Sequence, residues 1–259
     1  MARRSAWPFP AKVGGTTEIA DSRGGRTLRL DRFVSQAAGL SRSQARAAIR
    51  RGRVTVAGRP ERNAGFVLGG GQRVELEGEA IDLPRALYLM MNKPTGLLSA
   101  TRDSRQATVM SLLPPALARR VHLVGRLDKD TSGLLLLTDD GSWSHRVSSP
   151  RHHCAKTYLA QLAEPLAPDA EARLARGLLL RGDKSPTRPA AAQRLDACRV
   201  RVTLSEGRYH QVRRMFAALG NRVTDLHRES VGGLDLDPGL SQGQWRVLNP
   251  EEVAAVLAD

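Results

Sequence analysis

The residues with the clearest chemical potential lie in a charged segment that leads into an apolar one. The segment GRLDKD, residues 125–130, precedes four consecutive leucines at 134–137, a run with the length of a buried strand. Asp128 is therefore carried toward the interior with a cation on each side. Because burying an unpartnered carboxylate is costly, a fold tolerates it most readily at a reactive site. The alternative is a solvated loop before a core strand.

Asp130 follows Asp128 after one residue. In an extended segment two such carboxylates face the same side. Paired carboxylates can cleave glycosidic bonds, which makes an N-glycosidase one possible enzyme class.

A second charged cluster lies in SEGRYHQVRRMFAALGN, residues 205–221. The glycine permits a tight turn, and the apolar spacing after it predicts a helix with one inward face. Four basic residues gather at the start of this helix: Arg208, His210, Arg213 and Arg214. A helix N-terminus with guanidinium groups suits an anion, either a phosphate or a protein carboxylate such as Asp128. The alternative is a charged helix end on the surface.

The triplet His152-His153-Cys154 invites comparison with a zinc site. Adjacent ligands cannot easily point at one ion, and the usual two-residue gaps are absent. We therefore expect no metal here. The segment SSPRHHCAKTY instead resembles a polar loop whose Arg151 and His152 contact RNA.

A third basic group is predicted on a helix over residues 41–52. Ser41 and Gln44 form a capping-box pattern, and Gly52 ends the helix. Arg42, Arg46 and Arg50 recur every four residues and share one face. Residues 29–62 carry nine arginines but only two acids. With acidic partners scarce nearby, we expect this face to bind phosphates; a solvated helix surface is the alternative.

The composition limits the possible partners. The 259 residues carry a net charge of +14, which favours a polyanion. The apolar stretches are too short to span a bilayer and no basic amphipathic helix stands out, so nucleic acid is the expected partner and a membrane is not. Two cysteines form no disulfide framework and the N-terminus has no secretory signal, which fits a cytoplasmic protein.

The order of predicted elements indicates two domains after a basic, disordered tail at 1–26. Two helices and two short strands make a small α/β RNA-binding domain at 28–83, and a linker is expected over 79–86. Strands and helices then mix over 86–259 with many hairpin-like neighbours, including a turn at Asp139-Asp140-Gly141. This order predicts an α+β fold with a mixed, mainly antiparallel sheet flanked by helices.

Several motifs together resemble those of one enzyme family. VGRLDKDTSGLLLLTDDG is similar to the signature segment of the pseudouridine synthases of the RsuA type, and YLMMNKPTG, KTYL and EGRYHQVRRMF resemble their other motifs in the right order. The region 28–83 resembles a small RNA-binding module first known from a ribosomal protein. The resemblance spans about 230 residues and leaves out only the tail.

The resemblance implies roles for three residues. Asp128 is the catalytic aspartate, Tyr158 packs against the target base, and Arg213 pairs with the catalytic carboxylate and keeps it ionised for nucleophilic attack. Asp130 is then structural and caps the next turn. The implied reaction detaches uracil from its ribose, rotates it and rejoins it through carbon 5. It needs neither a metal nor an organic cofactor.

The resemblance also implies the substrate. The segments around 151–158 and 208–216 are most similar to the small-subunit branch, so a uridine in 16S rRNA is expected, within an assembling particle or as free RNA, and the protein is expected to act as a monomer. The alternatives are the same reaction on 23S rRNA and a non-catalytic assembly factor. The residues expected to contact RNA are Arg42, Arg46, Arg50, Arg53, Lys93, Arg126, Arg151, His152, Arg208, His210 and Arg214.

Overall fold

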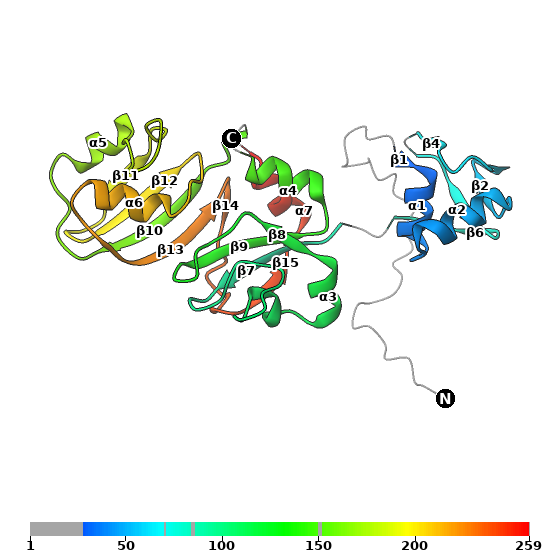
Figure 1. Ribbon diagram of the computed structural model, residues 1–259, viewed down its shortest axis with the longest axis horizontal. Coiled ribbons are helices and arrows are strands. Elements are labelled where there is room, and N and C mark those ends of the chain that lie inside the picture. Colours follow the sequence, from blue (N-terminus) through cyan, green and yellow to red (C-terminus); the bar gives the residue numbers. More distant parts are fainter. Residues whose placement is uncertain (1–27, 70, 84–85, 150–151, 259) are drawn as a thin grey trace. The chain divides into compact units, whose positions relative to one another are not determined.

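The computed structural model describes residues 28–69, 71–83, 86–149 and 152–258. The chain divides into two compact units with the boundary between residues 85 and 86 (Figure 1). The predicted tail at 1–26 and the predicted RNA contact Arg151 lie outside the described residues. In the ranges described, no helix has the length and apolar character needed to cross a bilayer.

The N-terminal unit packs two helices against short strands around one apolar core. The predicted capping box is present: the Gln44 amide donates to the Ser41 side chain, and the Gln44 side chain accepts from the Ser41 amide. Leu30, Val34 and Ile49 are fully buried in this core. The elements are β1 (Leu28–Arg29), α1 (Leu30–Ala37), α2 (Arg42–Arg50), β2 (Val54–Val56), β3 (Arg59–Pro60), β4 (Val67–Leu68), β5 (Val74–Leu76) and β6 (Glu79–Ala80). The predicted linker therefore begins with a strand, β6, which pairs with β5.

The C-terminal unit is built on one mixed sheet. Its nine strands in the described residues follow the order β11-β12-β10-β13-β9-β7-β15, with β8 beside β9 and β14 beside β13. Only the β9–β13 pairing is parallel among these. The strands are β7 (Tyr88–Lys93), β8 (His122–Val124), β9 (Ser132–Thr138), β10 (Lys156–Leu162), β11 (Ala191–Arg194), β12 (Arg199–Leu204), β13 (Val223–Val231), β14 (Leu234–Asp235) and β15 (Trp245–Val247). The predicted α+β class is confirmed.

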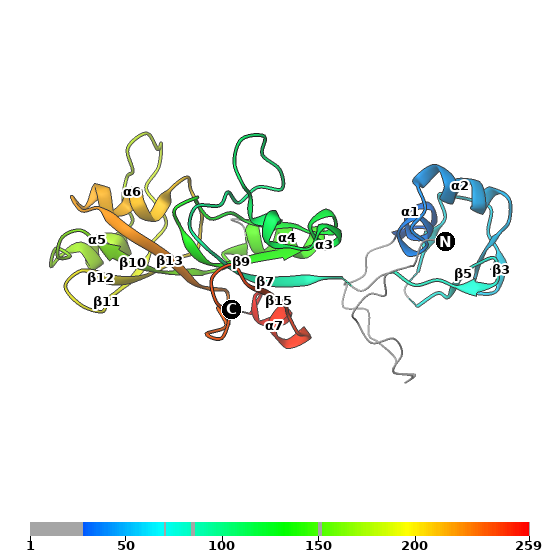
Figure 2. The same ribbon diagram turned by 90° about the horizontal axis from the view of Figure 1, so that it is seen from below.

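The leucine run forms the centre of β9, and both of its faces are covered. Leu135 and Leu137 pack in a cluster with Leu127, while Leu134 and Leu136 pack on the other face with Trp143. A strand covered on both sides needs a continuous apolar run rather than an alternating one. The short helices that cover the sheet are η1 (Val109–Leu112), α3 (Pro115–Arg120), α4 (Gly141–Ser148), α5 (Ala170–Arg176), α6 (Gln211–Ala218) and α7 (Pro250–Ala255). Figure 2 shows α6 on one side of the sheet and α7 on the other.

The turn predicted at 139–141 is wrong, because α4 begins there. The Asp140 carboxylate accepts hydrogen bonds from the Ser142 and Trp143 amides at 2.9 and 3.2 Å, so it is the N-cap of this helix. Aspartate followed by glycine satisfies both patterns, since a helix N-cap and a tight turn use the same side-chain oxygen.

Candidate active site

Asp128 lies in the loop between β8 and β9, and hydrogen bonds from Gly96 and Ser99 hold the backbone of this loop. The Ser99 hydroxyl donates to the Leu127 carbonyl at 2.7 Å and accepts from the Leu127 amide at 3.1 Å. The Gly96 amide donates to the Lys129 carbonyl at 2.7 Å. Backbone on both sides of Asp128 is thereby fixed, and its side chain is presented from a braced loop.

Lys93, at the end of β7, supports the same loop from the interior. Its side chain has no exposed surface, and its ammonium donates to the carbonyls of Pro94 and Thr131 at 2.9 Å and of Lys129 at 3.4 Å. The predicted RNA contact at Lys93 is therefore corrected: RNA cannot reach a fully buried ammonium whose donors are used by carbonyls.

The buried position changes the acidity of Lys93. Burial lowers its pKa to about 8, although the nearby carboxylates of Asp130 and Asp128 act in the opposite direction. The Lys93 ammonium is therefore a titratable group on the interior side of the loop that carries Asp128 and Asp130.

The Asp128 carboxylate faces His210, the residue that precedes α6. His210 Nε2 lies 3.4 Å from Asp128 Oδ1, and the side chains are 39% and 33% exposed. Among the described residues, no other side chain is in polar contact with this carboxylate. His210 adopts a left-handed backbone conformation, with φ of 47° and ψ of 37°, which is unusual for a residue other than glycine. The site therefore combines a partly exposed nucleophile candidate with one adjacent imidazole.

Arg213 binds Asp130, not Asp128, which corrects the predicted pair. Its Nη2 lies 2.9 Å from Asp130 Oδ2 and donates to the Asp130 carbonyl at 3.2 Å, while Nη1 donates to the Val223 carbonyl at 3.0 Å. Both terminal nitrogens of the guanidinium are engaged by these three oxygens, while Nε is buried without a hydrogen-bond partner in the described residues. Asp130 accordingly ties the loop to α6 and β13, and its side chain caps no turn.

Tyr158 lies on β10 where two apolar clusters meet. Its ring packs against the cluster that contains Leu127 and also against the one under α6. The Arg228 guanidinium lies 6.0 Å from the ring centroid. Because Leu127 directly precedes Asp128, this packing brings the tyrosine ring to the side of the candidate site.

Arg208 and Arg214 hold a neighbouring loop. Arg208 lies 2.8 Å from Asp183 and donates to the carbonyls of Ser185 and Pro186 at 2.8 and 2.6 Å. Arg214 also pairs with Asp183, and hydrogen bonds from Arg214 and Arg208 hold the pKa of this carboxyl below its usual value. The donors of both arginines are thus used within the protein, and the structure gives these two residues a role in fixing the loop.

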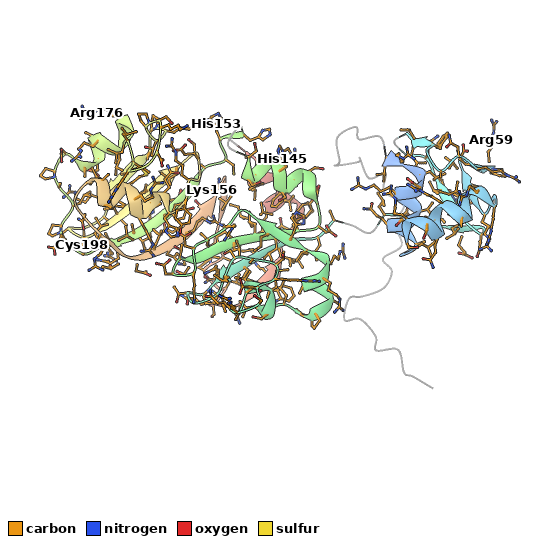
Figure 3. All side chains as sticks on the ribbon, viewed as in Figure 1. Arg59, His145, His153, Lys156, Arg176 and Cys198 are labelled. Atoms are coloured by element: carbon orange, nitrogen blue, oxygen red, sulfur yellow. The ribbon has the colours of Figure 1, made fainter. Side chains whose placement is uncertain are left out.

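The histidine-rich segment does not converge on one point. The His152 ring meets His145 edge to face with centroids 6.3 Å apart, and the Cys154 thiol lies against the Val256 carbonyl at 3.4 Å. Burial raises the pKa of that thiol. Figure 3 shows the separate positions of His145 and His153. In the described ranges, no three His, Cys, Asp or Glu side chains gather as a metal site.

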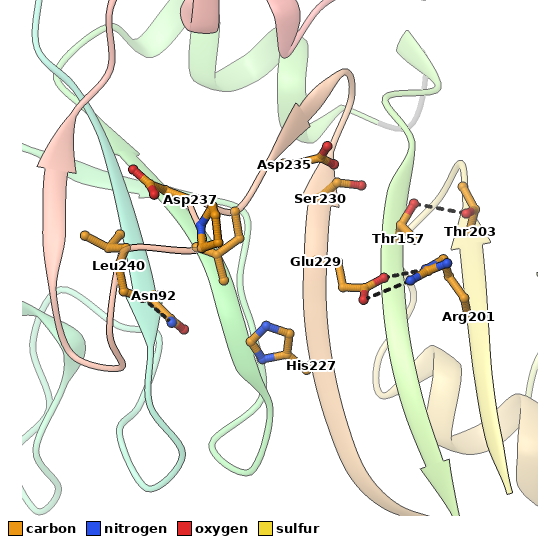
Figure 4. A pocket seen from close by; sticks show the side chains of 12 residues that line it. Asn92, Thr157, Arg201, Thr203, His227, Glu229, Ser230, Asp235, Asp237 and Leu240 are labelled. Atoms are coloured by element: carbon orange, nitrogen blue, oxygen red, sulfur yellow. Dashed lines mark hydrogen bonds and ion pairs between the residues drawn. The ribbon is translucent and has the colours of Figure 1, made fainter. Parts of the chain in front are cut away.

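Two cavities lie elsewhere on the C-terminal unit. One of about 720 Å³ is lined by Asn92, Thr157, Arg201 and His227 among others (Figure 4). Thr157 alternates with Tyr158 along β10, so this cavity opens on the face opposite α6 and the Asp128 carboxylate. A second, of about 450 Å³, has a mixed lining in which Arg102, His122 and the predicted RNA contact Arg126 are the basic side chains, and it reaches the start of the loop that carries Asp128.

In the N-terminal unit, the basic helix face does have an acidic partner. The Asp31 side chain is fully buried and lies 2.9 Å from Arg46, 3.4 Å from Arg42 and 3.5 Å from Arg29. The expectation that acids are missing nearby is therefore wrong. Burial raises the pKa of Asp31, but the Arg46 hydrogen bond and the three positive charges outweigh it, so the pKa falls below its usual value.

Other arginines of this unit lie at the surface and differ in their ion pairs. Arg50 is exposed and makes no ion pair with the part of the chain that the structure describes, whereas Arg53 pairs with Glu77 at 2.9 Å at the surface. Arg59 is likewise exposed, at the edge of the unit in Figure 3. Three arginines around one carboxylate, with further exposed arginines, leave this unit strongly positive.

Comparisons with known proteins match both units. The S4 domain family matches residues 28–74, and the RNA pseudouridylate synthase family matches residues 87–218. "Ribosomal small subunit pseudouridine synthase A" of Escherichia coli (strain K12) is 48% identical over 233 residues, which are 89% of this chain and 100% of the relative. The chain belongs to the RNA pseudouridylate synthase family.

Other relatives agree with this membership. The protein of the same name from Pasteurella multocida (strain Pm70) is 47% identical over 228 residues, covering 88% of this chain and 98% of the relative. A crystal structure of a pseudouridylate synthase superposes with a TM-score of 0.65 at 44% identity, covering 88% of this chain and 99% of that one.

Two features of this pseudouridylate synthase's site were not found by sequence reasoning. Lys93 ends the apolar strand YLMMNK, and that position is the signal that could have predicted burial of its ammonium. Tyr209 was not singled out, yet its ring stacks on His210 beside Asp128. Its signal is an aromatic residue in a basic, glycine-containing segment of a chain with only 4% aromatics.

Proposed function

We propose that this pseudouridylate synthase converts a uridine of 16S rRNA to pseudouridine, with the Asp128 carboxylate as nucleophile and without a metal or organic cofactor. The observation that carries the proposal is the partly exposed Asp128 carboxylate on a loop braced by Ser99, Lys93 and Gly96. The substrate is supported by relatives that carry the small-subunit name and are nearly half identical over their whole length. We further propose that the protein acts as a monomer in the cytoplasm.

The reaction requires few groups from the protein. The N1–C1′ bond of uridine breaks, the base rotates, and a C5–C1′ bond forms. One proton leaves C5 and one is gained at N1, so there is no net oxidation or proton change. A nucleophile and a proton acceptor are sufficient. Asp128 attacks either C1′ or C6, and both routes stay open; Tyr158 and Asp128 are the candidates for removing the C5 proton.

The target nucleotide has to leave its stack before Asp128 can reach it. In the proposal, the Tyr158 ring packs against the displaced base, which its place beside the Asp128 loop supports. Arg213 fixes the same loop through Asp130 and acts as a positioning residue. The role of Arg213 is therefore indirect.

The structured RNA around the target is held by phosphate contacts in this proposal. The groups from the N-terminal unit are Arg42, Arg46, Arg50 and Arg53, and those from the C-terminal unit are Arg126, Arg151, His152 and His210. The proposed phosphate contact of Arg126 is supported by the cavity that this residue lines together with Arg102. The proposed contact of Arg50 is supported by its exposed guanidinium, which has no ion pair among the described residues. Such contacts fix register and orientation and make binding depend on salt.

The test is chemical mapping of pseudouridines in rRNA from cells with and without the gene, and from deletion cells that carry Asp128→Asn or Asp130→Asn. We expect one uridine of 16S rRNA to lose its modification in the deletion and in Asp128→Asn. Asp130→Asn is the matched variant, because it makes the same chemical change two residues away; its amide oxygen still accepts from Arg213, so modification is expected to slow but not to be lost.

Each rival gives a different result. A missing site in 23S rRNA would assign the substrate to the large subunit, and full modification by Asp128→Asn would remove Asp128 as the nucleophile. Release of free uracil by the purified protein would favour an N-glycosidase. An unchanged pseudouridine map after deletion of the gene would favour a non-catalytic assembly factor.

A further inference from the structure

Tyr209 presents an aromatic ring to solvent next to the candidate nucleophile. It is 76% exposed, the most exposed large apolar side chain in the described residues. The chain has only three tyrosines, and the other two, Tyr88 and Tyr158, are partly buried against apolar clusters. An isolated exposed aromatic is common on protein surfaces, so exposure alone decides nothing.

The orientation of this ring is fixed by the structure. The Tyr209 and His210 rings stack with centroids 3.8 Å apart and planes 17° apart. The left-handed backbone at His210 turns the two rings onto one another, and Arg214 Nη1 donates to the Tyr209 carbonyl at 3.3 Å. One face of Tyr209 is therefore covered by the imidazole, and the opposite face remains available.

The stacked pair is joined to the reaction centre. The imidazole that covers Tyr209 is the same one that lies 3.4 Å from Asp128 Oδ1. A flat group resting on the outer face of Tyr209 is thus separated by one ring, that of Tyr209 itself, from the imidazole that contacts the nucleophile candidate. The arginines of the same segment, Arg208, Arg213 and Arg214, are paired with carboxylates of the protein, so this position offers a ligand stacking rather than charge.

We propose that the outer face of Tyr209 is a binding site for a nucleobase of the substrate RNA, the base adjacent to the uridine that is modified. This inference rests on the proposed function. When a uridine leaves its stack, the neighbouring base loses a stacking partner, and an exposed aromatic ring replaces that partner. Base stacking on aromatic side chains is tolerant of sequence, since every base has a π-face. The Tyr209 ring stacks on His210, and His210 contacts Asp128. A base bound on Tyr209 therefore positions the neighbouring target nucleotide at the loop that carries Asp128.

The experiment uses the full chain with Asp128→Asn, which blocks turnover, and an RNA fragment around the uridine found by the mapping above. 2-Aminopurine replaces the base on the 5′ side in one RNA and on the 3′ side in another. We expect its fluorescence to be quenched on binding in one of the two RNAs. Tyr209→Ala is expected to remove the quenching and weaken binding about 5- to 100-fold.

Two matched variants separate stacking from bulk. Tyr209→Phe keeps the ring and is expected to retain quenching and affinity within about twofold, whereas Tyr209→Leu keeps apolar area without a π-face and is expected to behave like Tyr209→Ala. Thermal unfolding of all variants checks that the fold is intact. With Asp128 restored, Tyr209→Ala is expected to raise KM more than it lowers kcat.

The inference and the proposed function fail separately. If Tyr209→Ala leaves quenching and affinity unchanged in both RNAs, or if Tyr209→Leu matches the native protein, the stacking site is overturned while modification by the native protein stands. If Asp128→Asn modifies the RNA, the proposed function fails, whatever the Tyr209 variants show.

Discussion

His210 Nε2 lies 3.4 Å from Asp128 Oδ1, while the arginine expected at that carboxylate, Arg213, binds Asp130 instead. The two acids of one loop thus have different partners from the same segment. Asp130, bound through both its carboxylate and its carbonyl, fastens the loop. Within the part of the chain that the structure describes, the Asp128 carboxylate has a side-chain contact on one oxygen only, which leaves the other available for attack.

His210→Asn tests whether this imidazole orients the Asp128 carboxylate. Asparagine tolerates the left-handed backbone at this position, but its shorter amide cannot reach Asp128. Because a misplaced nucleophile loses reactivity more than substrate affinity, we expect kcat to fall about 10- to 100-fold with little change in the unfolding temperature. Single-turnover kinetics at saturating RNA measure the effect.

His210→Gln is the matched variant, since its longer side chain carries an N–H group near the place of Nε2. We expect it to recover part of the lost rate. If both variants turn over RNA at the native rate, the contact with Asp128 has no part in orienting the nucleophile.

Lys93 gives stability a dependence on alkaline pH. Its pKa is lowered from 10.5 to about 8, so between these values the unfolded chain binds a proton that the folded chain lacks. The free energy of unfolding contributed by this group therefore rises with pH across that window, by up to about 3 kcal/mol, and is constant below pH 8.

The Lys93→Met variant isolates this contribution. It removes the titrating group and leaves the carbonyls of Pro94 and Thr131 without this donor, at about 1–3 kcal/mol for a buried acceptor left unsatisfied, whereas the Lys129 carbonyl keeps the Gly96 amide. We expect lower stability and a flatter dependence on pH from 8 to 10.5. Urea unfolding followed by tryptophan fluorescence provides the measurement, and parallel curves for the two proteins would contradict the assigned pKa.

Gly133 is expected to be intolerant of any side chain. Its φ is 103°, and a Cβ there would lie 2.3 Å from the Arg228 carbonyl across the parallel β9–β13 pair. Gly133→Ala should cost about 1–3 kcal/mol from the backbone conformation alone, with the clash added to it. Gly141→Ala is the control, because a Cβ in the first turn of α4 meets no atom within 4 Å. Equal unfolding temperatures for the two variants would argue against the close strand approach.

The sequence predicted what periodicity and caps control. The leucine strand, the capping box at 41–44 and the α+β class all follow from local patterns. Partner choice was predicted less well, since Asp128 and Asp130 are equivalent in sequence and only the loop conformation decides which one meets Arg213. The burial of Asp31 was not predicted either, because an aspartate on a helix between arginines has the sequence pattern of a surface residue and is buried only through tertiary packing.

The N-terminal unit provides the last prediction, which separates phosphate contacts from internal ion pairs. Arg50 makes no ion pair within the described residues, so Arg50→Ala should weaken RNA binding and reduce the slope of log K against log salt by about 1 without loss of stability. Arg46 is a proposed phosphate contact that also binds the buried Asp31, so Arg46→Ala should weaken RNA binding and in addition destabilise the unit by leaving that charge with weaker partners. Binding titrations from 50 to 300 mM salt, with thermal unfolding, distinguish the two. An unchanged salt slope for Arg50→Ala would remove this helix face from the RNA interface.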